Sequence, residues 1–261
     1  MTESNILLFL SVLPVFLLGY FIYNKDRNKE PLGIIAKLFV GGVLSCIVTL
    51  LVSALLYTLV PFFGTETNKL NLLELFIQVF VGVAMIEETS KWLFLYLFSY
   101  HDDEFDELYD MIVYGAFVAL GFACIENIMY VLDGGITTGI LRALCAVPGH
   151  AFDGVFMGYY LGLAKISEMN NREDLKRKNI LFSLLVPMIL HAIYDYCALS
   201  GRTILIIIFF IFVIILYVIA IKKINKTAKI TRKIKYKNTF CPVCGRKAES
   251  EYCPICGHKN D

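Results

Sequence analysis

Seven runs of apolar residues, each long enough to cross a lipid bilayer, take up most of this 261-residue chain. A transmembrane helix needs about 20 such residues. Hydrophobic residues make up 57% of the chain and charged residues only 18%, whereas a soluble domain is roughly half apolar and a quarter charged. The sequence therefore predicts an all-α polytopic membrane protein. Its predicted spans are approximately Asn5–Tyr23, Leu32–Val60, Leu72–Ser99, Met111–Leu132, Gly139–Lys165, Asn179–Leu199 and Thr203–Ile221.

The basic residues are concentrated in three connectors, which predicts the orientation of the chain. Residues 24–30 hold three Lys and Arg residues, residues 165–178 hold five and residues 222–237 hold eight, while every other connector holds at most one. Cytoplasmic loops collect Lys and Arg. We therefore expect a cell-membrane protein with its N-terminus outside and its C-terminus in the cytoplasm. The first run has no basic residue before it, unlike a signal peptide, so we expect it to be a permanent helix.

Four cysteines near the C-terminus, in the stretch CPVCGRKAESEYCPICG, have the spacing of a zinc ribbon. They are Cys241, Cys244, Cys253 and Cys256. Two close pairs of thiolates match the tetrahedral coordination of structural zinc, and the alternative, two disulfides, is disfavoured in the reducing cytoplasm. We therefore predict a membrane domain (residues 1–221), a basic linker (residues 222–239) and a cytoplasmic zinc ribbon (residues 240–261).

The basic linker is suited to a membrane surface. Its Lys and Arg residues are expected to lie against anionic lipid of the inner leaflet. Contact of the ribbon with the ribosome or with nucleic acid is a weaker candidate. The ribbon beyond it is expected to dock a cytoplasmic protein or to sense a cytoplasmic signal, because it follows the last predicted span.

Ionisable residues recur inside four successive predicted spans, although such residues are rare in membranes and usually face a bundle interior or an aqueous cavity. They are Glu87, Glu88 and Lys91 in the third span, Glu126 in the fourth, His150 and Asp153 in the fifth, and His191 and Asp195 in the sixth. At 1.5 Å per residue, one acid or imidazole of each span lies about 17–22 Å from its predicted cytoplasmic end. This common depth predicts a single polar site.

The spacing within the third span favours two roles for its carboxylates. Glu87 and Lys91 are four residues apart and are therefore neighbours on one face of a helix. Glu88 projects about 100° away from Glu87. One carboxylate can thus pair with Lys91 while the other faces a cavity, although a Glu–Lys pair by itself is equally typical of a structural contact.

The two histidines each have an aspartate one helical turn away. Asp153 follows His150 by three residues and Asp195 follows His191 by four, and a carboxylate so placed can orient an imidazole and fix its tautomer. A single membrane histidine is more often a structural hydrogen-bonding group, but two such pairs beside two glutamates favour function. Glycines at positions 115, 121, 149, 154, 158 and 162 would let these helices approach closely.

Two kinds of hydrolytic chemistry suit this set of residues. In the first, Glu126, His150 and His191 hold a zinc ion with an open position for water, and Glu88 accepts the proton of that water. In the second, which needs no metal, Glu88 and one histidine activate water while the other histidine stabilises the oxyanion. The chain contains no recognisable serine or cysteine nucleophile motif and no H-E-x-x-H motif.

The four ionisable motifs, in this order on successive helices, resemble those of the PrsW family of intramembrane proteases. They are Glu87-Glu88-x-x-Lys91, Phe122-x-x-x-Glu126-Asn127, His150-Ala-Phe-Asp153-Gly154 and His191-x-x-x-Asp195. The resemblance covers approximately residues 75–200. The related CAAX proteases carry an arginine and a histidine where this chain has Lys91 and Glu126, which favours the PrsW branch of the superfamily.

The resemblance implies a bacterial intramembrane peptidase, of metallo- or glutamic type, that cleaves a single-span membrane protein. The type member of the family acts on an anti-sigma factor in stress signalling. The resemblance also implies essential roles for Glu87, Glu88 and His191, with Glu126 and His150 completing the site. Two alternatives stay open at this stage: a non-catalytic scaffold, such as the scaffold subunit of the presenilin protease complex in the same superfamily, and a proton-coupled carrier.

Overall fold

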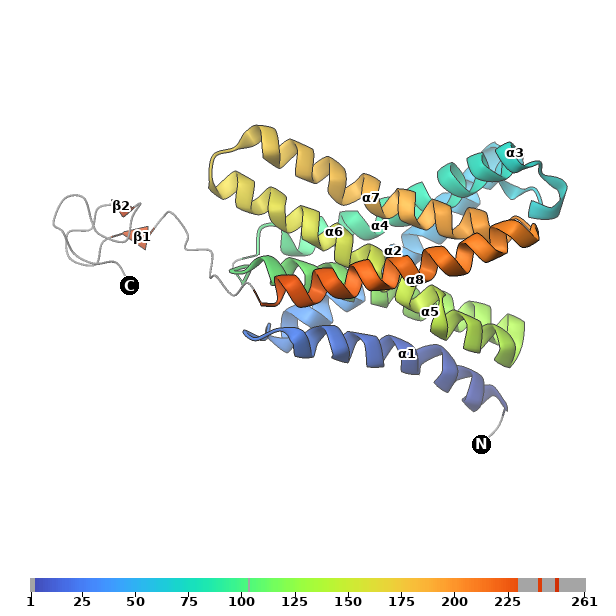
Figure 1. The fold of residues 1–261 in the computed structure, drawn as a ribbon, viewed down its shortest axis with the longest axis horizontal. Coiled ribbons are helices and arrows are strands. Elements are labelled where there is room, and N and C mark those ends of the chain that lie inside the picture. Colours follow the sequence, from blue (N-terminus) through green and yellow to red (C-terminus); the bar gives the residue numbers. More distant parts are fainter. Residues whose placement is uncertain (1–2, 103, 230–238, 241–246, 249–261) are drawn as a thin grey trace.

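The computed structural model describes residues 3–102, 104–229, 239–240 and 247–248. The long helices lie lengthwise in an elongated bundle (Figure 1). The helices are α1 (Glu3–Lys25), α2 (Leu32–Leu59), α3 (Leu72–Ile77), α4 (Met85–Ser99), α5 (Leu108–Leu144), α6 (Ala146–Met169), α7 (Glu173–Leu199) and α8 (Thr203–Thr227). Two short 3-10 turns, η1 (Pro61–Gly64) and η2 (Thr67–Lys69), join α2 to α3, and the π-helical segment η3 (Gln78–Ala84) joins α3 to α4.

The outer surface of the bundle is apolar, as expected for a protein surrounded by lipid. α8, for example, exposes Ile204, Ile211 and Ile214. Within the described residues, five segments are long and apolar enough to cross a membrane. They are Ser4–Lys25, Leu32–Leu59, Leu108–Met169, Glu173–Leu199 and Thr203–Thr227. The all-α membrane fold is thereby confirmed in its coarser form, with the Leu108–Met169 segment containing both α5 and α6.

The predicted third span is not among these five segments, because it is divided into three helical pieces and carries several charges. Its first piece, α3, begins at a capping box in which the Asn71 side chain accepts hydrogen bonds from the backbone N–H groups of Leu73 and Glu74. The π-helical segment η3 follows. A π-helix has a different number of residues per turn from an α-helix and often occurs at functional sites. Here it precedes Glu87 and Glu88, so it helps to determine which way these carboxylates point.

The predicted fourth and fifth spans meet at a sharp break in α5. A connector was expected between Leu132 and Gly139, and Gly135, where φ is 73°, divides α5 into two helical pieces there. Glycine adopts this left-handed conformation readily because it has no Cβ. The helical piece after this break ends at Leu144 and α6 begins at Ala146, so the predicted fifth span from Gly139 takes in both.

α5 and α6 pack closely at the centre of the bundle. A Cβ at Gly115 of α5 would lie 2.2 Å from the carbonyl oxygen of Gly154, and a Cβ at Gly154 would lie 2.4 Å from that of Gly115. Real Cβ atoms do not approach so closely, so this contact needs glycine on both helices. The predicted role of these glycines in close helix approach is confirmed, and the contact positions His150 and Asp153 on the neighbouring turn of α6.

Two short strands near the C-terminus pair in antiparallel fashion. They are β1 (Thr239–Phe240) and β2 (Lys247–Ala248), with Thr239 opposite Ala248. The four predicted zinc ligands, Cys241, Cys244, Cys253 and Cys256, lie outside the described residues. The zinc ribbon therefore stays a prediction.

Candidate active site

α4 places three ionisable side chains in the interior of the bundle. Lys91 Nζ lies 2.7 Å from Glu88 Oε1 and 3.3 Å from Glu87 Oε2. It also lies 4.0 Å from the centroid of the Phe122 ring on α5. Residues three and four positions apart share one side of a helix, so both carboxylates reach the same ammonium group. Lys91 and Glu88 are fully buried.

α5 and α6 add a second network, centred on Glu126. Arg142 Nη2 donates a hydrogen bond to Glu126 Oε2 at 2.6 Å, and His150 Nε2 lies 2.8 Å from the same oxygen. On the other side of the ring, His150 Nδ1 lies 3.1 Å from Lys91 Nζ. Because an ammonium group can only donate, His150 Nδ1 accepts this bond. His150 Nε2 then carries the proton and donates it to Glu126, so His150 links the two networks.

α7 brings His191 against both carboxylates of α4. His191 Nδ1 lies 2.8 Å from Glu88 Oε1, while His191 Nε2 lies 3.3 Å from Asp195 Oδ2 and 3.9 Å from Glu87 Oε2. The expected pair of His191 and Asp195 is thus present. The rings of His150 and His191 lie edge to face with centroids 5.3 Å apart. The four predicted spans therefore contribute to one continuous polar cluster.

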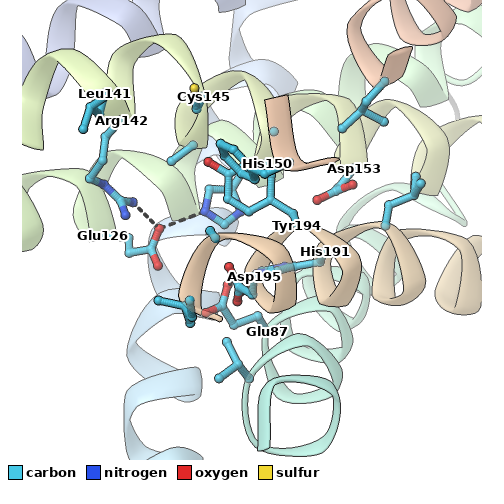
Figure 2. Close-up of a pocket in the computed structure, with 18 of the residues that line it drawn as sticks. Glu87, Glu126, Leu141, Arg142, Cys145, His150, Asp153, His191, Tyr194 and Asp195 are labelled. Atoms are coloured by element: carbon cyan, nitrogen blue, oxygen red, sulfur yellow. Dashed lines mark hydrogen bonds and ion pairs between the residues drawn. The ribbon is translucent and has the colours of Figure 1, made fainter. Parts of the chain in front are cut away.

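This cluster forms one side of a cavity of about 420 Å³. The polar side chains directed toward it in Figure 2 are Glu87, Glu126, Arg142, His150, Asp153, His191 and Asp195. Apolar side chains of α8, including Phe209 and Phe210, contribute to the lining. A chamber of this size lies within the range of small-ligand pockets, and it has both a polar and an apolar side. Such a chamber suits a short segment of an apolar peptide together with water.

A second cavity of about 400 Å³ lies toward α2. It is lined by hydroxyl groups of Thr49, Ser53 and Tyr57, and it shares Glu87 and Glu126 with the first cavity. These two carboxylates can therefore be approached from two directions. Glu88 and Lys91 line neither cavity and lie behind the polar wall.

The site has more acidic than basic groups. Within the described residues, five carboxyl groups meet two permanent cations, Lys91 and Arg142, and two imidazoles. An unbalanced charge at membrane depth costs at least about 2.5 kcal/mol. The site is therefore suited to taking up protons or a cation.

A metal ion fits this set of donors. One ligand atom from each of Glu87, Glu88, His150 and His191 lies within 4.8 Å of the other three, and carboxylate oxygen and imidazole nitrogen are usual ligands of catalytic zinc. Glu88 Oε2 is buried without a hydrogen-bond partner among the described residues, so it has a lone pair available for a cation. Glu126, which the sequence suggested as a ligand, lies beside this group and pairs with Arg142 and His150.

Two features of the site were not expected from the sequence. Arg142 was missed, and the only signal for it was a single arginine inside an apolar stretch. The sequence-based mechanism assigned Glu88 to the reacting water, but Glu87 lines the cavity while Glu88 turns toward Lys91 and His191.

The sequence matches the family described as "PrsW family intramembrane metalloprotease" over residues 30–221, a range that contains every residue lining the two cavities. Relatives named "Protease PrsW" include that of Oceanobacillus iheyensis, which is 34% identical over 82% of this chain and 93% of its own length. The protein of Bacillus subtilis is 35% identical over 70% of this chain and 77% of its own length. That of Clostridioides difficile is 30% identical over 89% of this chain and 95% of its own length. No solved structure matches the chain.

Proposed function

Because the chain belongs to the PrsW family of intramembrane metalloproteases and is a peptidase, we propose that it cleaves a membrane-anchored protein in the 420 Å³ cavity. One observation carries this proposal. Two carboxylates and two imidazoles from three helices bring their ligand atoms within 4.8 Å of one another beside that cavity. The family assignment favours this function over the two alternatives, a non-catalytic scaffold and a proton-coupled carrier.

Glu87 is the proposed general base. It is the α4 carboxylate that lines the cavity, and its contacts with Lys91 (3.3 Å) and His191 (3.9 Å) are longer than those of Glu88. A carboxylate near water can remove a proton as the water oxygen attacks the peptide carbonyl. The C–N bond then breaks, and Glu87 returns the proton to the leaving nitrogen.

The other groups hold this arrangement in place. Lys91 is a positioning residue, because its ammonium group pairs with both α4 carboxylates and its side chain does not line the cavity. Glu126 positions the ring of His150 through the 2.8 Å bond to Nε2. This bond leaves the lone pair of His150 Nδ1 facing the cluster, where it accepts from Lys91 Nζ at 3.1 Å.

Glu88, His150 and His191 would hold the catalytic zinc. Three protein ligands are usual for a catalytic zinc, and this choice leaves Glu87 free to act as the base. When bound, the zinc would supply a Lewis acid that polarises the peptide carbonyl. A second, structural zinc is proposed at Cys241, Cys244, Cys253 and Cys256.

The substrate is proposed to be a single-span membrane protein, with an anti-sigma factor in stress signalling as the first candidate. The chain is proposed to cross the bacterial membrane seven times, with α3, η3 and α4 together forming the third crossing. The distribution of basic residues supports an external N-terminus and a cytoplasmic C-terminus. In this orientation the ribbon would be available to a cytoplasmic protein.

Cleavage by the purified full chain in detergent tests the proposal. With a single-span peptide substrate, Glu87→Gln should lower kcat about 100-fold or more, since a general base contributes at least that much. Glu66→Gln is the matched control, because Glu66 is exposed and, within the part of the chain that the structure describes, forms an ion pair with Lys69 alone. A folded Glu87→Gln protein with full activity would contradict the proposed role of this residue.

Metal analysis separates the two proposed zinc sites. The wild-type chain should contain two zinc ions. The double variant His150→Ala/His191→Ala should keep only the zinc of the ribbon, and Cys241→Ser/Cys244→Ser should keep only the zinc of the active site. Loss of zinc from the histidine variant should abolish cleavage. An unchanged zinc content in that variant would exclude these histidines as ligands.

A further inference from the structure

A second buried cluster of ionisable groups lies where the α1–α2 connection meets the start of α5. It consists of Asp26, Glu30 and Asp110, and one carboxylate oxygen of each residue lies within 4.8 Å of the other two. The three residues are 4%, 4% and 0% exposed, respectively. Figure 1 shows the end of α1 and the start of α5 at the same end of the bundle, away from the N-terminus. The cluster shares no residue with the active site.

Two oxygens of this cluster are buried without a partner. Asp26 Oδ2 and Asp110 Oδ1 accept no hydrogen bond within the part of the chain that the structure describes. The second oxygen of each carboxylate is occupied. Asp26 Oδ1 accepts from the backbone N–H of Asn28 at 3.0 Å, and Asp110 Oδ2 accepts from those of Asp106 and Glu107. A buried acceptor without a partner is costly, so each free oxygen is suited to binding a positive group.

The described residues do not supply that positive group as an ion pair. No basic side chain among them lies within 4.0 Å of a carboxylate oxygen of Asp26, Glu30 or Asp110. Lys29 is the nearby candidate, but its ammonium group donates to Asn24 at 2.7 Å and lies over the ring of Tyr23. Among the described residues, the side chain of Glu30 accepts a hydrogen bond only from a neutral donor, the hydroxyl of Tyr114.

The spacing of the oxygens matches a hard divalent cation. Calcium takes oxygen ligands at about 2.3–2.6 Å, so two of its ligands lie at most about 5 Å apart. All three donors are carboxylate oxygens, and such sets select Mg²⁺ or Ca²⁺ over zinc.

We propose that Asp26, Glu30 and Asp110 bind one Mg²⁺ or Ca²⁺ ion that ties the α1–α2 connection to the start of α5. α5 also carries Glu126, so the ion would fix the end of a helix that contributes to the active site. The ion has no part in the proposed hydrolysis. The cation site and the peptidase can therefore be tested separately.

Equilibrium binding of radioactive Ca²⁺ to the purified full chain tests this site. Zinc is included in the buffer so that nitrogen and sulfur ligands elsewhere are already occupied. The wild-type protein should bind one Ca²⁺, and competition with Mg²⁺ identifies which of the two ions is preferred. Glu30→Gln and Asp110→Asn should each weaken binding at least 10-fold, because each removes one charged ligand while keeping an oxygen that can accept the existing hydrogen bonds.

Asp174→Asn is the matched control, since Asp174 is an exposed aspartate in the first turn of α7. It should bind Ca²⁺ like the wild type. If Asp110→Asn does not fold, Glu30→Gln alone decides, because its amide oxygen can still accept from Tyr114. Absence of binding to the wild type, or equal binding by Glu30→Gln, would overturn the proposal. Neither result would affect the proposed peptidase, whose readout is cleavage.

Discussion

The two buried clusters of ionisable groups in this protein differ in how their charge is balanced. The active-site cluster includes Lys91 and Arg142, which pair with its carboxylates at 2.6–3.3 Å. The cluster of Asp26, Glu30 and Asp110 contains acids only, with no ion pair among the described residues. The first is built into apolar helices, and the second lies at the end of the bundle.

This difference follows from the surroundings of each cluster. Charged groups at membrane depth are costly and usually pair with one another, and the active site carries its own cations. A cluster at the end of the bundle is close to water, from which an ion or proton can be drawn. We infer that the first cluster depends on particular side chains, whereas the second depends on the composition and pH of the solution.

Removal of Lys91 is expected to have the largest effect. Lys91→Met keeps the length of the side chain but leaves Glu87 and Glu88 without their shared cation. Breaking a buried ion pair in this way typically costs about 3–5 kcal/mol. The thermal midpoint of the detergent-solubilised protein should fall markedly, and cleavage should be lost.

An exposed pair provides the control for this result. Lys69 lies 3.1 Å from Glu66, and both side chains are about two-thirds exposed, so Lys69→Met should change the midpoint little. The double variant Lys91→Met/Glu88→Gln should regain part of the lost stability, because it removes one of the stranded charges. A Lys91→Met protein as stable as the wild type would show that the α4 carboxylates do not need this cation.

A change in helix packing should separate the two clusters. Gly154→Ala places a Cβ 2.4 Å from the carbonyl oxygen of Gly115 and 2.6 Å from the Cβ of Ala119, so α6 must move away from α5. Overpacking of this kind costs about 1–3 kcal/mol. Cleavage should fall because His150 moves, while Ca²⁺ binding should persist because the acidic cluster takes no residue from α6.

Gly33→Ala is the matched control, since nothing lies within 4 Å of a Cβ at this helical position. It should leave both cleavage and Ca²⁺ binding unchanged. Loss of Ca²⁺ binding in Gly154→Ala would mean that the two clusters are mechanically connected through α5.

The outline of the active site could be predicted from the sequence because ionisable residues inside apolar runs have few alternatives to a shared interior site. The i,i+4 spacings on α4 and α7 were sufficient to predict the contacts of Glu87 with Lys91 and of His191 with Asp195. The helical fold followed from the same apolar runs. These features depend on local periodicity, which a sequence displays directly.

The remaining features depend on backbone irregularities and on distant contacts. Which of Glu87 and Glu88 faces the cavity depends on helix rotation, and one residue changes the direction of a side chain by about 100°. The sequence of the π-helical segment before them, Gln78–Ala84, showed no pattern that predicts a π-helix. Arg142 reaches Glu126 because the chain turns back at Gly135. The acidic cluster joins the α1–α2 connection to the start of α5, about 80 residues further along the sequence.

Loss of the Arg142 charge should have a smaller effect than the changes above. Arg142→Gln removes the 2.6 Å bond to Glu126, but the two side chains are 16% and 13% exposed, so water can replace part of the interaction. We expect a loss of about 1 kcal/mol in stability. We also expect a clear fall in kcat, because Glu126 would no longer hold the ring of His150 as firmly.

Arg202→Gln is the control for this variant, since Arg202 is exposed immediately before α8. It should match the wild type in both measurements. An Arg142→Gln enzyme with an unchanged kcat and a lower thermal midpoint would assign Arg142 a purely structural role.

The smallest expected effect is a pH dependence of stability that originates in the acidic cluster. Burial and Asp26 raise the pKa of Glu30 from its ordinary value of 4.5 to about 7, so the folded state holds a proton that the unfolded state releases between these values. Without added divalent cations, stability should therefore fall as the pH rises from about 5 to 7. Glu30→Gln should flatten this slope, and Ca²⁺ should reverse it by favouring the ionised carboxylates. Thermal midpoints measured across this range provide the test, and an identical slope in Glu30→Gln would place the titrating group elsewhere.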